Sequence, residues 1–247
     1  MVLLSGGADL SQSAVMTLSA VVAFQSLGGR NELIAPVILL SLALGAIVGL
    51  FNGMMISQLR VPPFLLTLGS RTIVYGVGLV FTRGAPQGRI TPLFRQVLGQ
   101  TYVLGIPGQV LYWGTVVLLG WLLLSWTVFG RRLYATGANP LAARQSGIRV
   151  GRILITAYTL SAVLAALGGL ILAARSGNAD NALGTGYELN AIAASVIGGT
   201  SFSGGRGSLA GTVGGVLLMT MLANILNILG LGPASHQVAT GLVIIAA

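Results

Sequence analysis

The sequence predicts an all-α, polytopic transmembrane helical bundle of about eight apolar segments, some of them short or broken. Hydrophobic residues make up 54% of the 247 residues and charged residues only 7%, whereas a soluble domain is about 45–50% apolar and about 25% charged. The apolar residues gather in runs, and a helix needs roughly 20 of them to cross about 30 Å of hydrocarbon. We therefore expect residues 1–247 to form a single membrane domain.

The apolar segments follow one another along the chain. Segment 10–27 is interrupted by serine and glutamine, 33–57 is strongly apolar, and 64–81 follows Pro62 and Pro63, which suit the first turn of a helix. A polar connector with three prolines spans 83–108. After it, we expect apolar segments at 110–129, 153–174, 189–197, 209–229 and 237–247.

The connector 130–152 contains five of the 13 arginines. Positive residues near span ends are retained in the cytoplasm, so this connector is expected on the cytoplasmic side. Its centre, 139–146, has a helix-like pattern with a polar and proline start, which we interpret as a docking element; topology alone explains the arginines equally well. Alternation of the spans then places Arg60 and Arg206 on the same side, and the connectors 83–108 and 175–188 on the other.

Missing residue types exclude several kinds of chemistry. The chain has no lysine, so it lacks the phosphate-binding loop that ATP hydrolysis would need. It has no cysteine and one histidine, His236, which leaves no zinc site, and we expect no catalytic residue, metal or bound cofactor. The net charge of +9 would suggest nucleic acid in a soluble protein. Here the arginines lie between apolar runs, so lipid headgroups and no nucleic acid are expected.

Glycines at intervals of four residues predict close helix packing, because a missing side chain lets another backbone approach. We interpret them as packing seams, for which static packing is favoured at any single residue and sliding during transport is the functional alternative. The segment 198–207 contains five glycines and is expected to form a broken or re-entrant turn, since each glycine costs a helix about 1 kcal/mol. The two series are Gly45, Gly49 and Gly53, and Gly207, Gly211 and Gly215.

Polar side chains within apolar spans are candidates for a translocation pathway. Each of them could instead hydrogen-bond to a neighbouring helix, and that packing role is the alternative for every one. The candidates are Asp9, Gln12, Asn52, Glu188, Asn190, Asn224 and Asn227.

Four ordered motifs span nearly the whole chain. They are GGADLS (6–11), GRRLYATG (130–137) with Asn139 and SGI (146–148), GTGYEL (184–189), and SVIGGTS (195–201) with GGRGS (204–208). Together they resemble ribose-type sugar permeases, the membrane subunits of bacterial binding-protein-dependent ABC importers. Ala8, Gln12 and Ser13 stand where that family more usually has isoleucine, valine and glycine.

The resemblance implies a multi-pass protein of the bacterial inner membrane that translocates a sugar of the pentose or hexose class. Its implied partners are a second permease subunit, in a homo- or heterodimer, a cytoplasmic ATP-binding subunit that hydrolyses the ATP, a periplasmic sugar-binding protein and membrane lipid. The 130–152 connector would be the coupling element that enters a groove on the ATPase. Its implied coupling residues are Asn139, Pro140, Ala142, Ala143, Arg144, Ser146, Gly147 and Ile148.

Two other functions are consistent with a polytopic bundle. A branched-chain amino-acid ABC permease would share the coupling logic and differ in substrate. An ion-coupled secondary transporter would need carboxylates or histidines within the membrane as relays, and this chain offers few. The resemblance also implies further spans before Met1, and no charge follows the last apolar run, so we expect the chain to be truncated at both ends and not to transport alone.

Overall fold

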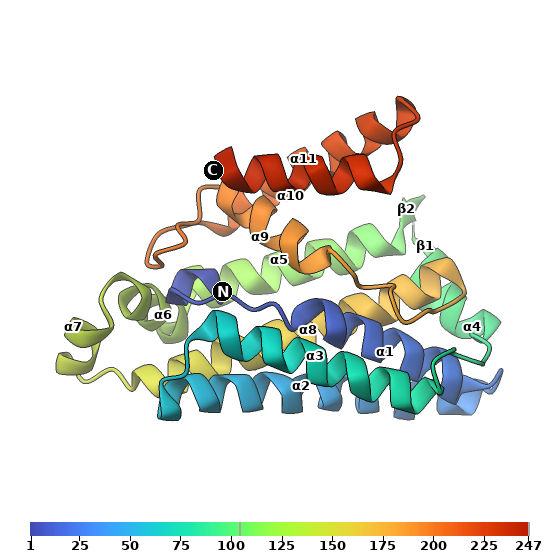
Figure 1. Ribbon diagram of the computed structural model, residues 1–247, viewed down its shortest axis with the longest axis horizontal. Helices are drawn as coiled ribbons and strands as arrows, with labels where there is room; N and C mark the ends of the chain where they lie inside the picture. Colours follow the sequence, from blue (N-terminus) through green and yellow to red (C-terminus); the bar gives the residue numbers. More distant parts are fainter. Residues whose placement is uncertain (104, 247) are drawn as a thin grey trace.

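The computed structural model describes residues 1–103 and 105–246 and confirms the helical bundle (Figure 1). Eight apolar helices correspond to the eight predicted segments. Five are long enough to cross a membrane, namely α2 (Ile34–Leu59), α3 (Pro63–Thr82), α5 (Gly108–Trp126), α8 (Val150–Ser176) and α10 (Leu209–Ile228). Three are shorter, namely α1 (Gln12–Leu27), α9 (Tyr187–Ile197) and α11 (Pro233–Ala246).

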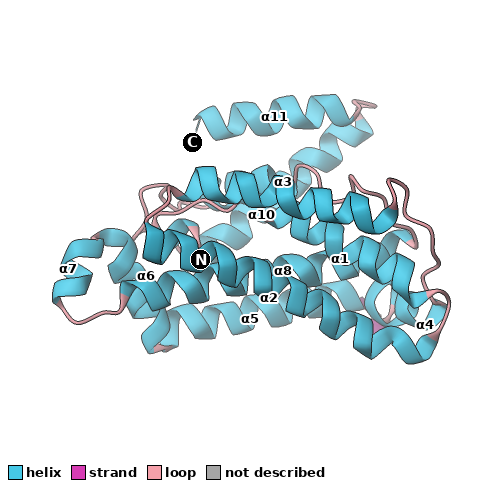
Figure 2. Ribbon diagram, turned by 60° about the horizontal axis from the view of Figure 1, so that its bottom comes forward, coloured by secondary structure: helices cyan, strands magenta, loops and turns pink. Residues whose placement is uncertain are grey.

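Helix α1 is the central helix of the bundle. It packs against α2, α3 and α8, and every residue from Ser13 to Ala23 except Met16 is buried. The outer helices instead expose large apolar side chains, such as Ile47 on α2 and Val80 on α3, which suits contact with lipid. Helices α9, α10 and α11 form a second layer (Figures 1 and 2), in which α11 packs on α9 and α10.

The connectors gather at the two ends of the bundle (Figure 1). One end, which we call the α7 end, holds α6 (Val128–Ala138), α7 (Pro140–Gln145), the turn between α2 and α3, and the glycine-rich loop 198–207. The opposite end holds the 83–107 connector and the turn after α8. This grouping matches the alternation that we expected from the sequence, and the side of the membrane that each end faces remains a prediction.

The 83–107 connector is more ordered than a polar linker. It forms α4 (Pro92–Phe94), a π-helical turn η3 (Arg95–Gln100) and two antiparallel two-residue strands, β1 (Tyr102–Val103) and β2 (Ile106–Pro107), with Val103 opposite Ile106. Ile90 and Phe94 are buried in the same core as α1, and the Arg89 amide donates to the Phe24 carbonyl at 3.1 Å. The connector therefore caps the bundle, because it supplies apolar side chains as well as polar ones.

The span that contains α1 is broken near its start. A short 3-10 turn, η1 (Leu3–Ser5), is followed by non-helical backbone, with Gly6 at φ 78°, and α1 begins at Gln12 rather than at residue 10. Asp9 Oδ1 accepts hydrogen bonds from the amide (3.0 Å) and the hydroxyl (2.6 Å) of Ser11. A carboxylate that binds its own neighbours in this way competes with helix formation, which accounts for the later start.

The two glycine series differ in structure. Gly45, Gly49 and Gly53 all face α8: an added Cβ would lie 2.8 Å from the Ala162 carbonyl, 2.6 Å from Thr159 Cα and 2.6 Å from Ile155 Cα, respectively. Backbones at that separation leave no room for a side chain.

The second series corrects our expectation of one helix face. Helix α10 begins at Leu209 with Ser208 as its N-cap, so Gly207 lies in the preceding loop, at φ 148°. Gly211 and Gly215 do lie on the helix, against the Gly198 and Ala194 carbonyls. The serine hydroxyl, which accepts from the Gly211 amide at 3.0 Å, fixes this start.

Candidate functional site

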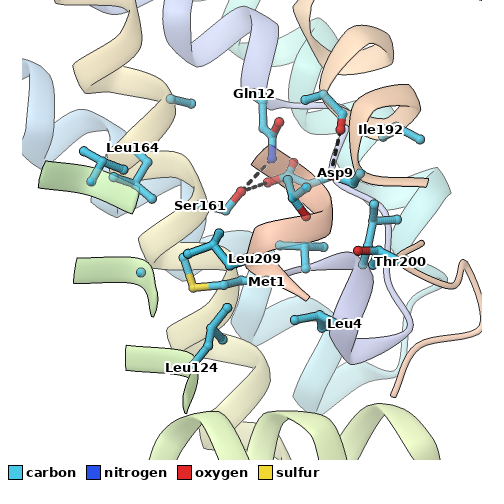
Figure 3. A pocket seen from close by; sticks show the side chains of 18 of the residues that line it. Met1, Leu4, Asp9, Gln12, Leu124, Ser161, Leu164, Ile192, Thr200 and Leu209 are labelled. Atoms are coloured by element: carbon cyan, nitrogen blue, oxygen red, sulfur yellow. Dashed lines mark hydrogen bonds between the residues drawn. The ribbon is translucent and has the colours of Figure 1, made fainter. Parts of the chain in front are cut away.

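A cavity of about 340 Å³ lies beside the break in the first span (Figure 3). Gln12 Nε2 donates to Ser161 Oγ at 2.7 Å, and that hydroxyl lies 3.4 Å from Asp9 Oδ2. Three polar side chains thus converge from the break, α1 and α8. Most of the remaining wall is apolar, including Leu124, Leu164, Ile192 and Leu209. An apolar cavity with a few convergent polar groups is the usual form of a small-molecule site; we call it the Asp9 cavity.

Asn52 belongs to the support of this site and not to its wall. Its side chain is fully buried. Asn52 Nδ2 donates to Ser11 Oγ at 3.0 Å, and Ser70 Oγ donates to Asn52 Oδ1 at 2.5 Å. The chain of hydrogen bonds from α3 through α2 to the break holds Ser11, and through it Asp9, in a fixed position.

Glu188 forms an ion pair that sequence reasoning missed. The Arg71 guanidinium on α3 lies 3.0 Å from Glu188 Oε1 in the first turn of α9, and the glutamate side chain is 2% exposed. This is the one salt bridge within residues 1–103 and 105–246. An arginine in the middle of an apolar span is costly unless it is paired, and that cost was the signal in the sequence for a nearby carboxylate.

The remaining candidates lie apart from the Asp9 cavity. Asn190 Oδ1 accepts from the Thr240 hydroxyl at 3.0 Å, which ties α9 to α11. Asn190, Asn224 and His236 line a separate cavity of about 400 Å³ between α9, α10 and α11. Asn227 is exposed in the last turns of α10. The structure therefore brings Asp9 and Gln12 together and leaves the asparagines of α9 and α10 elsewhere.

Helix α7 is short, capped at both ends and exposed along one side. Asn139 Oδ1 accepts from the Leu141 and Ala142 amides, both at 3.0 Å, and Pro140 occupies the first turn. At the other end, the amide of Gly147, at φ 79°, donates to the Arg144 carbonyl at 3.0 Å. These caps supply the hydrogen bonds that six helical residues alone would leave unmade.

One side of this element is anchored and the other is free. Ala143 is buried, and Ile148 packs against a core cluster that includes Leu4, Leu133 and Ile153. The side chains of Leu141, Ala142 and Arg144 are exposed. The exposed face combines an apolar, a small and a cationic residue. Ala142 and Arg144 were expected in the docking element, whereas Ala143, also expected there, faces the core and is not available for docking.

Helix α6 connects α7 to the glycine-rich loop. The apolar segment that we expected to end at 129 ends at Trp126, because the Thr127 hydroxyl accepts from the Gly130 amide at 3.2 Å and starts α6. The Tyr134 hydroxyl donates to the Gly207 carbonyl at 2.9 Å. Burial raises the pKa of Tyr134, which keeps this hydroxyl protonated as a donor.

The first residues of the chain also contact α6 and the glycine-rich loop. The Leu4 carbonyl accepts from the Gly205 amide at 2.9 Å, and an added Cβ at Gly137 would overlap the Leu4 carbonyl. The glycine-rich loop is a non-helical turn, as predicted, with Gly204 and Gly205 at positive φ. Helix α6, the start of the chain and the loop between α9 and α10 are therefore in direct backbone contact.

Comparison with known proteins identifies the family. Residues 1–247 match the family described as branched-chain amino acid transport system / permease component. The chain belongs to this permease family. It is a multi-pass inner-membrane protein, as its five long apolar helices indicate, and a transport component rather than an enzyme.

The similarity to known permeases covers nearly all of this chain and about three quarters of each relative. Ribose import permease protein RbsC of Bacillus subtilis (strain 168) is 43% identical, with 100% of this chain and 76% of the relative covered. RbsC of Escherichia coli (strain K12) is 39% identical, with 100% and 78% covered. Galactose/methyl galactoside import permease protein MglC of Escherichia coli (strain K12) is 39% identical, with 97% and 76% covered. No solved structure matches the permease at a significant level.

Proposed function

We propose that the permease is the membrane-spanning subunit of an ATP-driven importer that carries a pentose or hexose across the bacterial inner membrane. The observation that carries this proposal is the 39–43% identity to ribose import permeases over the whole of the chain. The family description names branched-chain amino acids, whereas the relatives named above import ribose or galactose. Sugar is therefore the favoured substrate class.

The energy for import comes, in this proposal, from a separate cytoplasmic ATP-binding subunit. The exposed face of α7 is its docking site, with Leu141 and Ala142 in a groove and Arg144 paired with a carboxylate of the ATPase. Charge-assisted pairs of arginine with carboxylate are about twice as strong as neutral hydrogen bonds. The caps on α7 support this role, because a preformed helix loses little conformational entropy on docking.

The motion of the ATPase would reach the spans through α6. Its contacts with the Gly207 carbonyl and the Leu4 carbonyl link it to the loop that leads into α10 and to the broken segment before α1, and both of these line the Asp9 cavity. Rigid elements joined at such contacts transmit a displacement better than flexible loops do. We infer that the Asp9 cavity is part of the sugar pathway and that the close packing of α2 on α8 is the fixed frame.

Identification of the co-purifying proteins tests this proposal. The tagged permease should bring down an ATP-binding subunit, a second permease subunit and, after cross-linking, a periplasmic sugar-binding protein. Replacement of residues 139–148 by a Gly/Ser linker of equal length should leave the spans inserted and remove the ATPase only. Recovery of a periplasmic protein that binds amino acids instead of sugars would overturn the substrate class, and an intact ATPase complex after the replacement would overturn the docking role.

A further inference from the structure

A second polar recess lies against another face of α1, between α1 and α3. It has a volume of about 250 Å³. From α1, Gln12 and Met16 line the Asp9 cavity, whereas the next residue after each, Ser13 and Thr17, lines this recess. Its polar wall consists of Ser13, Thr17, Arg71, Thr72, Tyr75 and Thr185; we call it the Arg71 recess.

Two buried oxygens near this recess have no partner in the described part of the chain. One is the hydroxyl of Ser13, which is 2% exposed and lines the recess. The other is Oε2 of Glu188, whose Oε1 is held by Arg71. A buried oxygen without a hydrogen-bond partner is unfavourable, because it has lost its bonds to water and gained none in return. One such group lies in the wall, and the second belongs to Glu188, which is outside the wall and is the partner of the arginine that lines it. The unpaired hydroxyl in the wall indicates that a ligand with hydroxyl groups supplies the missing hydrogen bond.

The arginine can take part while it remains paired. A guanidinium has five N–H donors, and one nitrogen, Nη2, makes the contact with Glu188. The side chain is 35% exposed and lines the recess, so its other donors are available to a ligand. Tyr75 adds an aromatic ring, and Thr17 is already satisfied because it accepts from the Gly184 amide at 3.0 Å. The wall thus offers donors, an acceptor and a ring, with the positive charge locally balanced.

These properties match a neutral polyol. Hydroxyl groups of a sugar donate and accept on several sides, and its C–H faces stack on aromatic rings. A zwitterionic amino acid would need separate sites for an ammonium and a carboxylate, and the described wall has no carboxylate to pair with the ammonium. Pockets that bind drug-sized ligands measure about 300–1,000 Å³, so a recess of about 250 Å³ suits a smaller molecule of monosaccharide size.

We propose that the Arg71 recess is a monosaccharide-binding subsite of the permease, in which Ser13 and Arg71 hydrogen-bond to sugar hydroxyls while Glu188 holds the guanidinium in place. This inference rests on the proposed function, because it assigns the sugar of that function to a second place in the bundle. Since α1 separates this recess from the Asp9 cavity, a sugar would bind at the two sites in succession as it moves along one path around α1.

Protection of an introduced cysteine tests the subsite directly, because the chain has no cysteine. Thr72 is exposed and lines the recess, whereas its neighbour Ile73 is exposed and does not line it. The rate of modification of Thr72→Cys by a small methanethiosulfonate should fall saturably as ribose is added to the purified complex. Ile73→Cys is the matched control, and its rate should not change.

Ser13→Ala separates binding from folding. Removal of an unpartnered hydroxyl should not lower the melting temperature, but in the Thr72→Cys background it should raise the ribose concentration for half-protection about threefold to tenfold. Absence of protection by ribose or galactose, equal protection of Ile73→Cys, or no effect of Ser13→Ala would each overturn the subsite. ATP-dependent ribose uptake measured in parallel is the independent test: uptake without protection leaves the proposed function standing and removes only this inference.

Discussion

The Tyr134 hydroxyl on α6 donates a hydrogen bond to the carbonyl oxygen of Gly207, 2.9 Å away. The two residues are separated by 73 positions in the sequence, and they join the element that carries α7 to the loop that leads into α10. Together with the contact of Gly137 on Leu4, this bond makes the α7 end a single connected unit. Coupling between an ATPase and the spans would pass through it.

Tyr134→Phe should weaken coupling more than stability. One hydrogen bond contributes about 0.5–1.5 kcal/mol, so we expect sugar transported per ATP hydrolysed to fall roughly twofold to tenfold, with the complex still assembled. Tyr112→Phe is the control, since it removes a similar bond to the Val97 carbonyl (2.6 Å) at the opposite end. Equal transport ratios in the two variants would contradict a coupling role for Tyr134.

Gly49→Ala should destabilise the packing of α2 on α8. The added Cβ would lie 2.6 Å from both Thr159 Cα and the Tyr158 carbonyl, and overpacking of this kind costs about 1–3 kcal/mol. Gly76→Ala on α3 meets nothing within 4 Å, so the better helix propensity of alanine should leave it neutral or more stable. Thermal unfolding in detergent compares the two, and a Gly49→Ala melting temperature at or above that of Gly76→Ala would show that the helices are not in close contact.

Arg71→Leu should cost more stability than Glu188→Leu. The first change leaves a carboxylate that is 2% exposed without its partner, whereas the second leaves an arginine that is 35% exposed and can reach solvent. Removal of one partner from a buried pair costs about 3–5 kcal/mol, and the double variant should recover part of that loss. Unfolding measurements on the four proteins give the coupling energy; a value near zero would mean that the pair contributes nothing to the fold.

Sequence patterns predicted the helices of this permease well and its polar contacts poorly. Apolar runs gave eight segments close to their observed bounds, because helix length is set by the thickness of the membrane. The glycine spacing predicted that another backbone packs closely on one face of α2, and the structure shows that this backbone is α8. The Arg71–Glu188 pair joins residues 117 positions apart in separate spans, and no local periodicity specifies which spans meet. Asn52 was a pathway candidate because it is a polar residue in an apolar span. Only the three-dimensional arrangement shows that its side-chain amide is hydrogen-bonded to Ser11 and Ser70.

Single cysteines at Ala138 and Ala182 should be labelled from opposite sides of the membrane. Both positions are exposed in connectors, and one long helix, α8, lies between them. An impermeant maleimide added to intact spheroplasts should modify Ala182→Cys and spare Ala138→Cys until the membrane is opened. Labelling of Ala138→Cys alone would reverse the orientation and place α7 away from any cytoplasmic ATPase.

Uptake of labelled ribose into proteoliposomes is the most direct test of the central claim. The permease would be reconstituted with its co-purifying ATPase and binding protein, with ATP available to the ATPase and no proton gradient. We predict ATP-dependent accumulation of ribose or a closely related monosaccharide, which ceases when residues 139–148 are replaced by the Gly/Ser linker. Accumulation of leucine or valine instead, or sugar uptake that needs a proton gradient and no ATP, would contradict the claim.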